Sequence, residues 1–118
     1  MAKKITVYSC SGCSNVAQLA NSIAIKLHRE KIANMSCIAG VGGDVPSLVK
    51  IAHDSEKIIA IDGCALSCVE KCLNRHEIKP DSHIVLTNLN VSKNIFTEAS
   101  EEKFDEAYEY VLEELELL

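Results

Sequence analysis

The stretch KIIAIDGCALSC, residues 57–68, decides the fold that we expect for this chain. It opens with a short apolar run rich in isoleucine and ends in an Asp-Gly pair and two cysteines. Such a run, with no regular polar alternation, is typical of a strand buried on both faces of a parallel sheet. The stretch ITVYSCSGCS, residues 5–14, repeats the arrangement, because its cysteines again follow an apolar run directly.

Two more runs of this kind, and the helical periodicity between all four, predict an α/β fold. The apolar runs are residues 5–9, 34–40, 57–62 and 83–88, and segments with helical spacing separate and follow them. Four alternations of strand and helix predict a single three-layer domain over residues 1–118, with a mostly parallel four-stranded sheet and four helices. By analogy with flavodoxin-like and Rossmann-like folds, we expect the strand order 2-1-3-4.

Capping residues and apolar spacing predict where the helices begin and which side chains they bury. Asn15 with Gln18 resembles a capping box for the first helix, Asp44 is the expected cap of the second, and Pro46 fits its first turn. Residues 89–99 are expected to form a loop. The side chains expected to face the core are Val16, Leu19, Ala20, Ile23 and Leu27, then Leu48, Ile51 and Ala52, then Leu66, Val69 and Leu73, and finally Phe104, Tyr108, Val111, Leu112 and Leu115.

Composition and charge exclude several classes of protein. The chain has 118 residues, of which 47% are apolar, and a net charge of −5. Residues 101–118 hold eight acidic side chains and one lysine, so the acidity belongs to one terminal helix, expected to be a solvated face. Lysine and arginine form no cluster typical of nucleic-acid binding. No apolar run could span a membrane or act as a secretory signal, so we expect a cytoplasmic protein without a nucleic-acid or membrane partner.

Six cysteines are the unusual part of the composition. In a reducing compartment they indicate metal binding or thiol chemistry rather than disulfides. With the strand order 2-1-3-4, the carboxyl ends of the first and third strands are neighbours at the point where ligands bind in such sheets. Cys10 and Cys13 follow one of these strands, and Cys64 and Cys68, expected on one face of a helix, follow the other. Four thiolates satisfy tetrahedral zinc, so these four residues are the predicted metal ligands.

The histidines and the remaining cysteines are expected to lie apart from this site. His28, His53 and His76 fall near the ends of predicted helices, and His83 opens the last strand, which places all four at the opposite edge of the sheet. A site made only of sulfur favours zinc or an iron–sulfur cluster over harder ions. Cys37 is a small core residue or a reserve ligand in place of Cys13. Cys72 is expected to be structural, because it lies too far along the helix.

The same residues also bear on phosphate binding, redox chemistry and the role of Asp62. The glycine-rich segment GVGGD, residues 40–44, lacks the lysine and hydroxyl residue of a phosphate-binding loop and is interpreted as a turn. The CxxC pair of Cys10 and Cys13 is also compatible with a redox dithiol. Asp62 forms hydrogen bonds to loop amides, orients a ligand, or serves only as the first residue of an Asp-Gly turn.

Three blocks of sequence together resemble one known family. CSGCSNVAQLAN (residues 10–21), CIAGVGG (37–43) and IDGCALSC (61–68) are similar to the DGC-domain proteins, which are described as zinc-binding and take their name from an Asp-Gly-Cys motif, here residues 62–64. The resemblance covers roughly residues 5–87. It implies cysteine-bound zinc carried by Cys10, Cys64 and Cys68, together with Cys13, and it implies no particular reaction.

The expected function is therefore that of a small zinc-binding protein whose metal has a structural or metal-handling role. The alternative is a thiol redox, sulfur-transfer or iron–sulfur protein that uses the same cysteines. Whether the chain is an enzyme stays open at this point.

Overall fold

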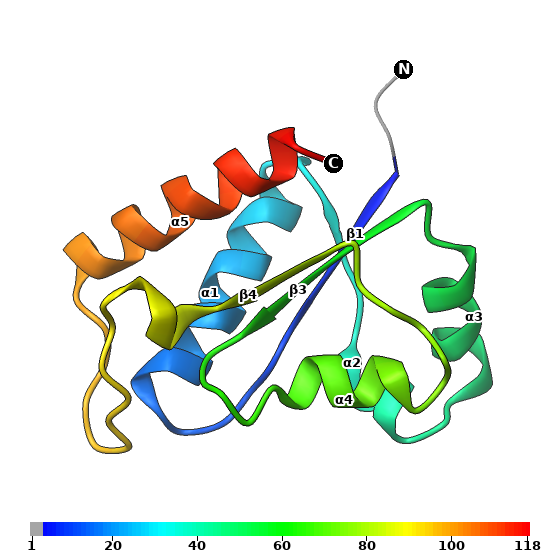
Figure 1. The fold of residues 1–118 in the computed structure, drawn as a ribbon, viewed down its shortest axis with the longest axis horizontal. Helices are drawn as coiled ribbons and strands as arrows, with labels where there is room; N and C mark the ends of the chain where they lie inside the picture. Colours follow the sequence, from blue (N-terminus) through cyan, green and yellow to red (C-terminus); the bar gives the residue numbers. More distant parts are fainter. Residues whose placement is uncertain (1–3) are drawn as a thin grey trace.

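A computed structural model describes residues 4–118 and contains a fully parallel sheet of four strands (Figure 1). The strands are β1 (Ile5–Ser9), β2 (Asn34–Met35), β3 (Lys57–Asp62) and β4 (Ser82–Val85). Their order in the sheet is β2-β1-β3-β4, which confirms the predicted order 2-1-3-4. β1 and β3 are therefore the two central strands.

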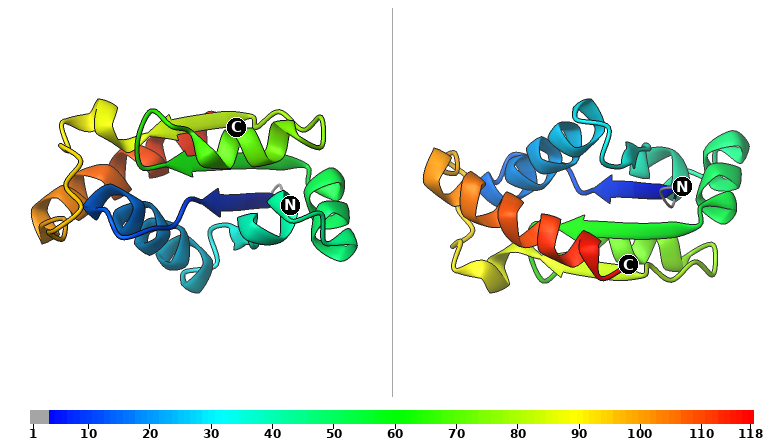
Figure 2. Two further views of the ribbon diagram at one scale, coloured as in Figure 1. Left: turned by 90° about the horizontal axis from the view of Figure 1, so that it is seen from below. Right: turned by 90° about the horizontal axis from the view of Figure 1, so that it is seen from above.

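Helices cover both faces of the sheet, so the three-layer α/β prediction is confirmed. α1 (Asn15–Arg29) and α5 (Glu101–Glu116) pack on one face. α2 (Ile38–Gly42), α3 (Pro46–Asp54) and α4 (Cys68–Asn74) belong to the other, and Figure 2 shows the two faces in turn. A single 3₁₀ turn, η1 (Leu86–Leu89), follows β4. None of the helices in residues 4–118 is long and apolar enough to cross a membrane.

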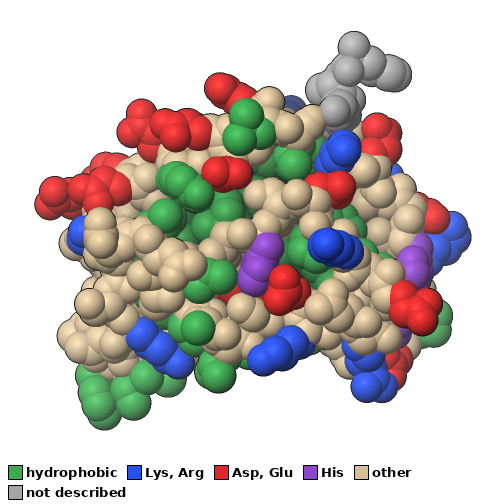
Figure 3. All heavy atoms as spheres, viewed as in Figure 1, with side chains coloured by type: hydrophobic (Ala, Val, Ile, Leu, Met, Phe, Trp, Pro, Cys, Tyr) green, Lys and Arg blue, Asp and Glu red, His purple; other side chains and the backbone are tan. Residues whose placement is uncertain are grey.

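The core is divided by the central strands, whose side chains are buried on both faces. Val7, Ile59 and Ile61 pack against α1 and α5, whereas Tyr8 and Ala60 face α2, α3 and α4. Burial on both faces explains why the apolar runs in β1 and β3 are continuous rather than alternating. The acidic side chains of α5 lie on its outer surface, where they gather along the upper edge of the molecule in Figure 3.

Two predicted strands are shorter than expected. Residues 34–40 were expected to form one strand, but only Asn34–Met35 pair with β1, and the next residues form α2. Close packing explains the change, because a side chain at Gly42 would bring its first carbon within 2.8 Å of the sulfur of Cys72 on α4. The glycines therefore let α2 approach its neighbours as a helix. Residues 83–88 are likewise divided between β4 and η1.

The helix starts differ from the predicted ones. α1 is capped by Ser14, whose Oγ accepts a hydrogen bond from the Ala17 N–H at 3.1 Å, and not by Asn15. Gln18 donates to the carbonyl of Gly12 rather than closing a capping box. Asp44 does not cap α3 either, since it is paired with Arg75, the residue directly after α4, and leaves Val45 at the cap position. Pro46 does occupy the first turn of α3.

Most of the predicted core positions are buried, but two are exposed and Leu48, Phe104 and Leu112 are only partly buried. Leu66 is 59% exposed because α4 begins only at Cys68, two residues later. Ile51 is 44% exposed because α3 packs at the periphery and buries only Ala52 fully. The apolar faces of α1 and α5 are confirmed, although Phe104 and Leu112 are only partly buried.

Replacing the capping hydroxyl should destabilise the fold measurably. Ser14→Ala removes the acceptor for the Ala17 N–H, and caps of this kind contribute about 1 kcal/mol. We expect the free energy of unfolding, measured by urea denaturation, to fall by about that amount. Ser22→Ala, at an exposed position of the same helix, is the control and should change stability by less than about 0.5 kcal/mol. Equal effects of the two variants would contradict the assigned cap.

Candidate cysteine site

Two turns meet at the carboxyl ends of the central strands. Ser9 of β1 is paired with Ile61 of β3, so the chain leaves both strands at nearly the same level. The first turn leads into α1 and the second into α4. Between them lies a cavity of about 200 Å³. Its walls include the four cysteines that the sequence places together, Cys10, Cys13, Cys64 and Cys68.

Cys10 ties the two turns to each other. Its backbone N–H donates to the Ile61 carbonyl at 3.2 Å, and its sulfur accepts a hydrogen bond from the Gly63 N–H at 3.1 Å. Burial raises the pKa of the Cys10 thiol, the Gly63 amide opposes this effect, and the nearby Asp62, Cys68 and Cys64 raise the pKa further. Cys10 therefore lies close enough to the second turn for Cys64 and Cys68 to affect its pKa.

Cys64 lies beside a cation that comes from a distant part of the chain. The sulfur of Cys64 is 3.5 Å from Nζ of Lys93, in the loop between η1 and α5. Asn15 at the start of α1 holds this loop, because its side chain donates to the Ser92 carbonyl at 2.8 Å and accepts from the Asn94 N–H at 2.7 Å. The sequence predicted only a loop at residues 89–99 and offered no signal that Lys93 belongs to the site.

The other two cysteines of the cavity are exposed. Cys68 is the first residue of α4, whereas Cys64 lies in the preceding turn, which is closed by a hydrogen bond from the Ser67 N–H to the Cys64 carbonyl. The expectation that Cys64 and Cys68 share a helical face is therefore wrong. Ser67 interrupts the helix between them because its backbone is left-handed, with φ of 52°. The turn nevertheless leaves both sulfurs at the cavity wall.

Cys37 and Cys72 lie elsewhere. Cys72 is one helical turn beyond Cys68, faces Gly42 of α2 and does not line the cavity. Burial raises the pKa of its thiol, and Cys68 and Asp62 add to that effect. Cys37 precedes α2 and lines a different cavity. The structure therefore brings together the four predicted ligands around one cavity and places Cys37, the alternative ligand, at another.

The donor chemistry of the cavity suits a soft metal ion, although its side chains are not gathered around one point. All six cysteines have free thiols. Within residues 4–118, no three side chains from cysteine, histidine, aspartate or glutamate converge closely enough to hold an ion. Four sulfur ligands on two short turns match the preference of zinc for thiolates. Metal binding therefore requires rotation of side chains, for which the exposed Cys13 and Cys68 have the most room.

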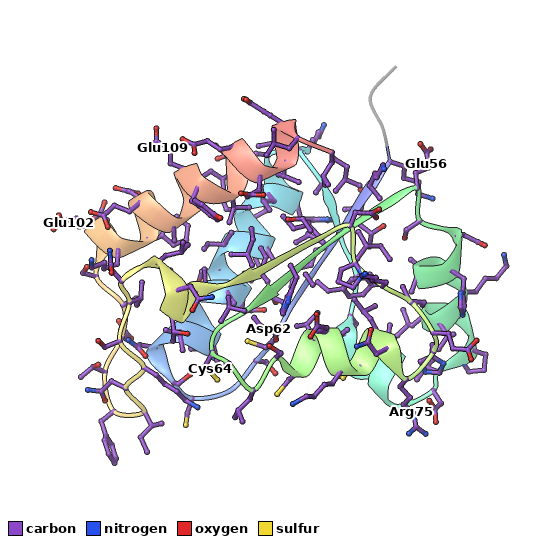
Figure 4. All side chains as sticks on the ribbon, in the orientation of Figure 1. Glu56, Asp62, Cys64, Arg75, Glu102 and Glu109 are labelled. Carbon is purple, nitrogen blue, oxygen red and sulfur yellow. The ribbon has the colours of Figure 1, made fainter. Side chains whose placement is uncertain are left out.

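Asp62 organises the second turn from the inside. Its carboxylate is 1% exposed and accepts hydrogen bonds from the N–H groups of Val69 at 2.8 Å and Glu70 at 3.3 Å. It therefore caps α4, which has no capping side chain at Ser67. Figure 4 shows Asp62 between the end of β3 and the start of α4, next to Cys64. Asp62 therefore bonds to backbone amides as expected, but to those of the first turn of α4 rather than to those of a loop.

His83 corrects the expectation that every histidine lies at the far edge of the sheet. β4 enters the sheet at Ser82, opposite Ile59, so His83 is level with Ala60 rather than with the start of β3. Its Nε2 lies 2.8 Å from an oxygen of Asp62, and its Nδ1 lies 3.2 Å from Glu70. His83 therefore supports the turn that carries Cys64 and Cys68, without lining the cavity itself.

The glycine after Asp62 is required by a close approach of two backbones. A side chain at Gly63 would place its first carbon 2.7 Å from the carbonyl carbon of Val16 and 2.9 Å from the amide nitrogen of Ala17. Both atoms belong to the backbone of the first turn of α1 and cannot rotate away. The Gly63 carbonyl also accepts from the Thr87 N–H at 3.1 Å, so the turn is held from two sides.

Comparison with known proteins gives one family and one close relative. The family model described as the DGC domain matches residues 6–111. A protein of Pseudomonas aeruginosa named "Anaerobic and virulence modulator AnvM" is 58% identical over 87 residues. That alignment covers 74% of this chain and 66% of the relative, just under two thirds of its length. No solved structure matches the chain.

A methyl group at position 63 should disturb the contact between the two turns. Gly63→Ala forces the backbone of α1 outward, and overpacking of this kind costs about 1–3 kcal/mol. We expect a corresponding loss in the free energy of unfolding, measured by urea denaturation. Ala65→Ser, at an exposed position of the same turn, should change stability by less than about 0.5 kcal/mol. If Gly63→Ala were as stable as the wild type, the backbones of Gly63 and of the first turn of α1 could not be in close contact.

Neutralising Asp62 should weaken the start of α4. Asp62→Asn replaces one acceptor oxygen by an N–H₂ group that must face another donor, and bonds to a charged group contribute about 1.5–3 kcal/mol. We expect lower stability, and a smaller loss when His83→Gln is already present, because the two side chains are bonded. Asp105→Asn on the exposed side of α5 is the control. Additive effects of Asp62→Asn and His83→Gln would contradict the pairing.

Proposed function

The chain belongs to the DGC domain family, and from this premise we propose that it binds zinc through cysteine thiolates at the carboxyl edge of the sheet. The observation that carries the proposal is the cavity in which cysteines from two separate turns meet. Cys10 of the first turn and Gly63 of the second are 53 residues apart in sequence, and the pairing of β1 with β3 brings them together.

The proposed ligands are Cys10, Cys13, Cys64 and Cys68. Cys10 and Cys64 are partly buried and have fixed neighbours, whereas Cys13 and Cys68 are exposed and can move toward them. Four thiolates around zinc form a closed site without an open position for hydrolytic chemistry. They also leave a net negative charge, which Lys93 beside Cys64 would partly compensate.

A metal-handling role fits this chain better than a role in holding the fold. Zinc is needed for folding mainly in domains too small to build a core. Here two apolar clusters fill both faces of the sheet, and the turns are anchored by hydrogen bonds that involve no metal. We therefore expect the metal-free protein to remain folded, with the ion exchanging at the surface of a preformed structure.

Thiol chemistry is the second candidate function. Lys93 places an ammonium group 3.5 Å from the sulfur of Cys64, next to the atom at which thiol exchange would take place. Cys10, Cys13 and Cys68 line the same cavity and could act as resolving thiols. This candidate includes redox exchange, sulfur transfer and an iron–sulfur cluster, all on the same four residues.

The name of the relative from Pseudomonas aeruginosa, a modulator, supports a regulatory setting for this chemistry. We propose that the chain acts in the cytoplasm, where thiols stay reduced. Its regulatory signal would be the occupancy of the cavity by metal or the oxidation state of the cavity thiols. The comparison with the relative rests on the 87 aligned residues, which are 66% of its length.

Metal content distinguishes the two candidates. Protein purified without oxygen should contain one zinc per chain, measured by plasma mass spectrometry, and two freely reacting thiols instead of six. Cys10→Ser and Cys64→Ser should lower the zinc content by at least about tenfold, because each removes an anchored thiolate. Cys72→Ser is the matched control, since Cys72 does not line the cavity.

Three results would change the assignment. Iron with inorganic sulfide would support the cluster, and no metal with rapidly reacting cavity thiols would support redox or sulfur-transfer chemistry. Unfolding of the protein on chelation, followed by circular dichroism, would show that the metal holds the fold.

A further inference from the structure

A second cavity, of about 390 Å³, lies on the other side of β1 from the cysteine site. Pairing of β1 with β2 stops at Val7 and Met35, although β1 continues to Ser9. The chain then leaves the sheet and turns into α2, as Figure 1 shows. The end of β1 therefore has no neighbouring strand on this side, and the cavity occupies the space between α1 and α2.

One wall of this cavity carries hydrogen-bond donors. Ser9 donates to Oδ1 of Asn21 at 3.5 Å, which leaves the N–H₂ group of Asn21 as a donor. The Met35 N–H donates to Nδ1 of His28 at 3.0 Å, so the proton of the neutral ring is on Nε2. The hydroxyl groups of Ser11 and Ser36 also line the cavity. No carboxylate of residues 4–118 does so.

A buried hydroxyl next to this wall lacks a partner. Tyr8 is fully buried, and its hydroxyl makes no hydrogen bond of ordinary geometry within the described residues, although Ser36 lies nearby. Burial raises the pKa of Tyr8, the Ser36 hydroxyl lowers it, and Cys37 raises it. Because Tyr8 does not line the cavity, its hydroxyl lies behind the wall and is not one of the donors that face a ligand.

We propose that this cavity binds a small carboxylate molecule with a short apolar part. A carboxylate accepts several hydrogen bonds at once, which matches the donors of Asn21, His28 and Ser36. The apolar part would lie against Met35, Ile38 and Ala39 on the opposite wall. The thiol of Cys37 is exposed at the same cavity and reports on its occupancy. The site shares no cysteine with the proposed zinc ligands, so it does not depend on them.

Alkylation of Cys37 by two reagents of similar size tests this site. Iodoacetate carries a carboxylate and iodoacetamide a neutral amide; with either, the sulfur bonds to the methylene carbon and iodide leaves. Peptide mass spectrometry gives the rate at each cysteine in the same molecule. In chelator-treated protein, where Cys13 carries no metal, we expect the rate ratio of iodoacetate to iodoacetamide to be at least about tenfold higher at Cys37 than at the exposed Cys13, and to saturate with concentration. Propionate should slow the reaction of Cys37, and propionamide should not.

Variants and metal loading complete the test. Asn21→Ala and Ser36→Ala should abolish the preference of Cys37 for iodoacetate, while Ser22→Ala, on the exposed part of α1, should preserve it. The ratio of iodoacetate to iodoacetamide rates at Cys37 itself should be equal in zinc-loaded and chelator-treated protein. Equal ratios at Cys37 and Cys13 without saturation would overturn the proposal. Protection of Cys37 by zinc would overturn it as well, because Cys37 would then belong to the metal site, whereas loss of zinc binding alone leaves this site unaffected.

Discussion

The parallel pairing of β1 with β3 is the constraint on which the rest of the structure depends. The two strands are central, run side by side over five residue pairs and end at the same level. Their following turns are therefore neighbours, even though they are far apart in the chain. The contact between these turns is tight enough that position 63 has no room for a side chain. The cysteine cavity is a direct consequence of this pairing, because its four thiols come from the two turns.

Hydrogen bonds to buried groups hold the turns in place without a ligand. Asp62 accepts from the first turn of α4 and from His83, and the sulfur of Cys10 accepts from Gly63. Asn15 fixes the loop that brings Lys93 to Cys64. Chain segments from four parts of the sequence thus meet at one edge of the sheet. Such anchoring leaves only the exposed thiols free to adjust, which suits a site that takes up and releases an ion.

The early end of β2 creates a second, different environment at the same edge. On the β3 side of β1 the wall carries four cysteines, whereas on the β2 side it carries hydroxyl, amide and imidazole groups and a single cysteine, Cys37. The two cavities are separated by the end of β1, and Ser11 contributes to both. A sheet with a full-length second strand would have filled the space that the second cavity occupies. The short strand is therefore the feature that gives the molecule two kinds of binding wall.

The sequence by itself determined the alternation of strands and helices, the continuous burial of β1 and β3, and the grouping of Cys10, Cys13, Cys64 and Cys68. These follow from apolar periodicity and from the rule that parallel strands end at one edge. Only the tertiary structure decided that residues 38–42 form a helix, that Ser14 rather than Asn15 caps α1, and that His83 and Lys93 support the cysteine turns. Each of these depends on contacts between segments distant in the chain, which local patterns do not encode: glycines that admit a neighbouring helix, a buried carboxylate that attracts an imidazole, and a loop held by one asparagine.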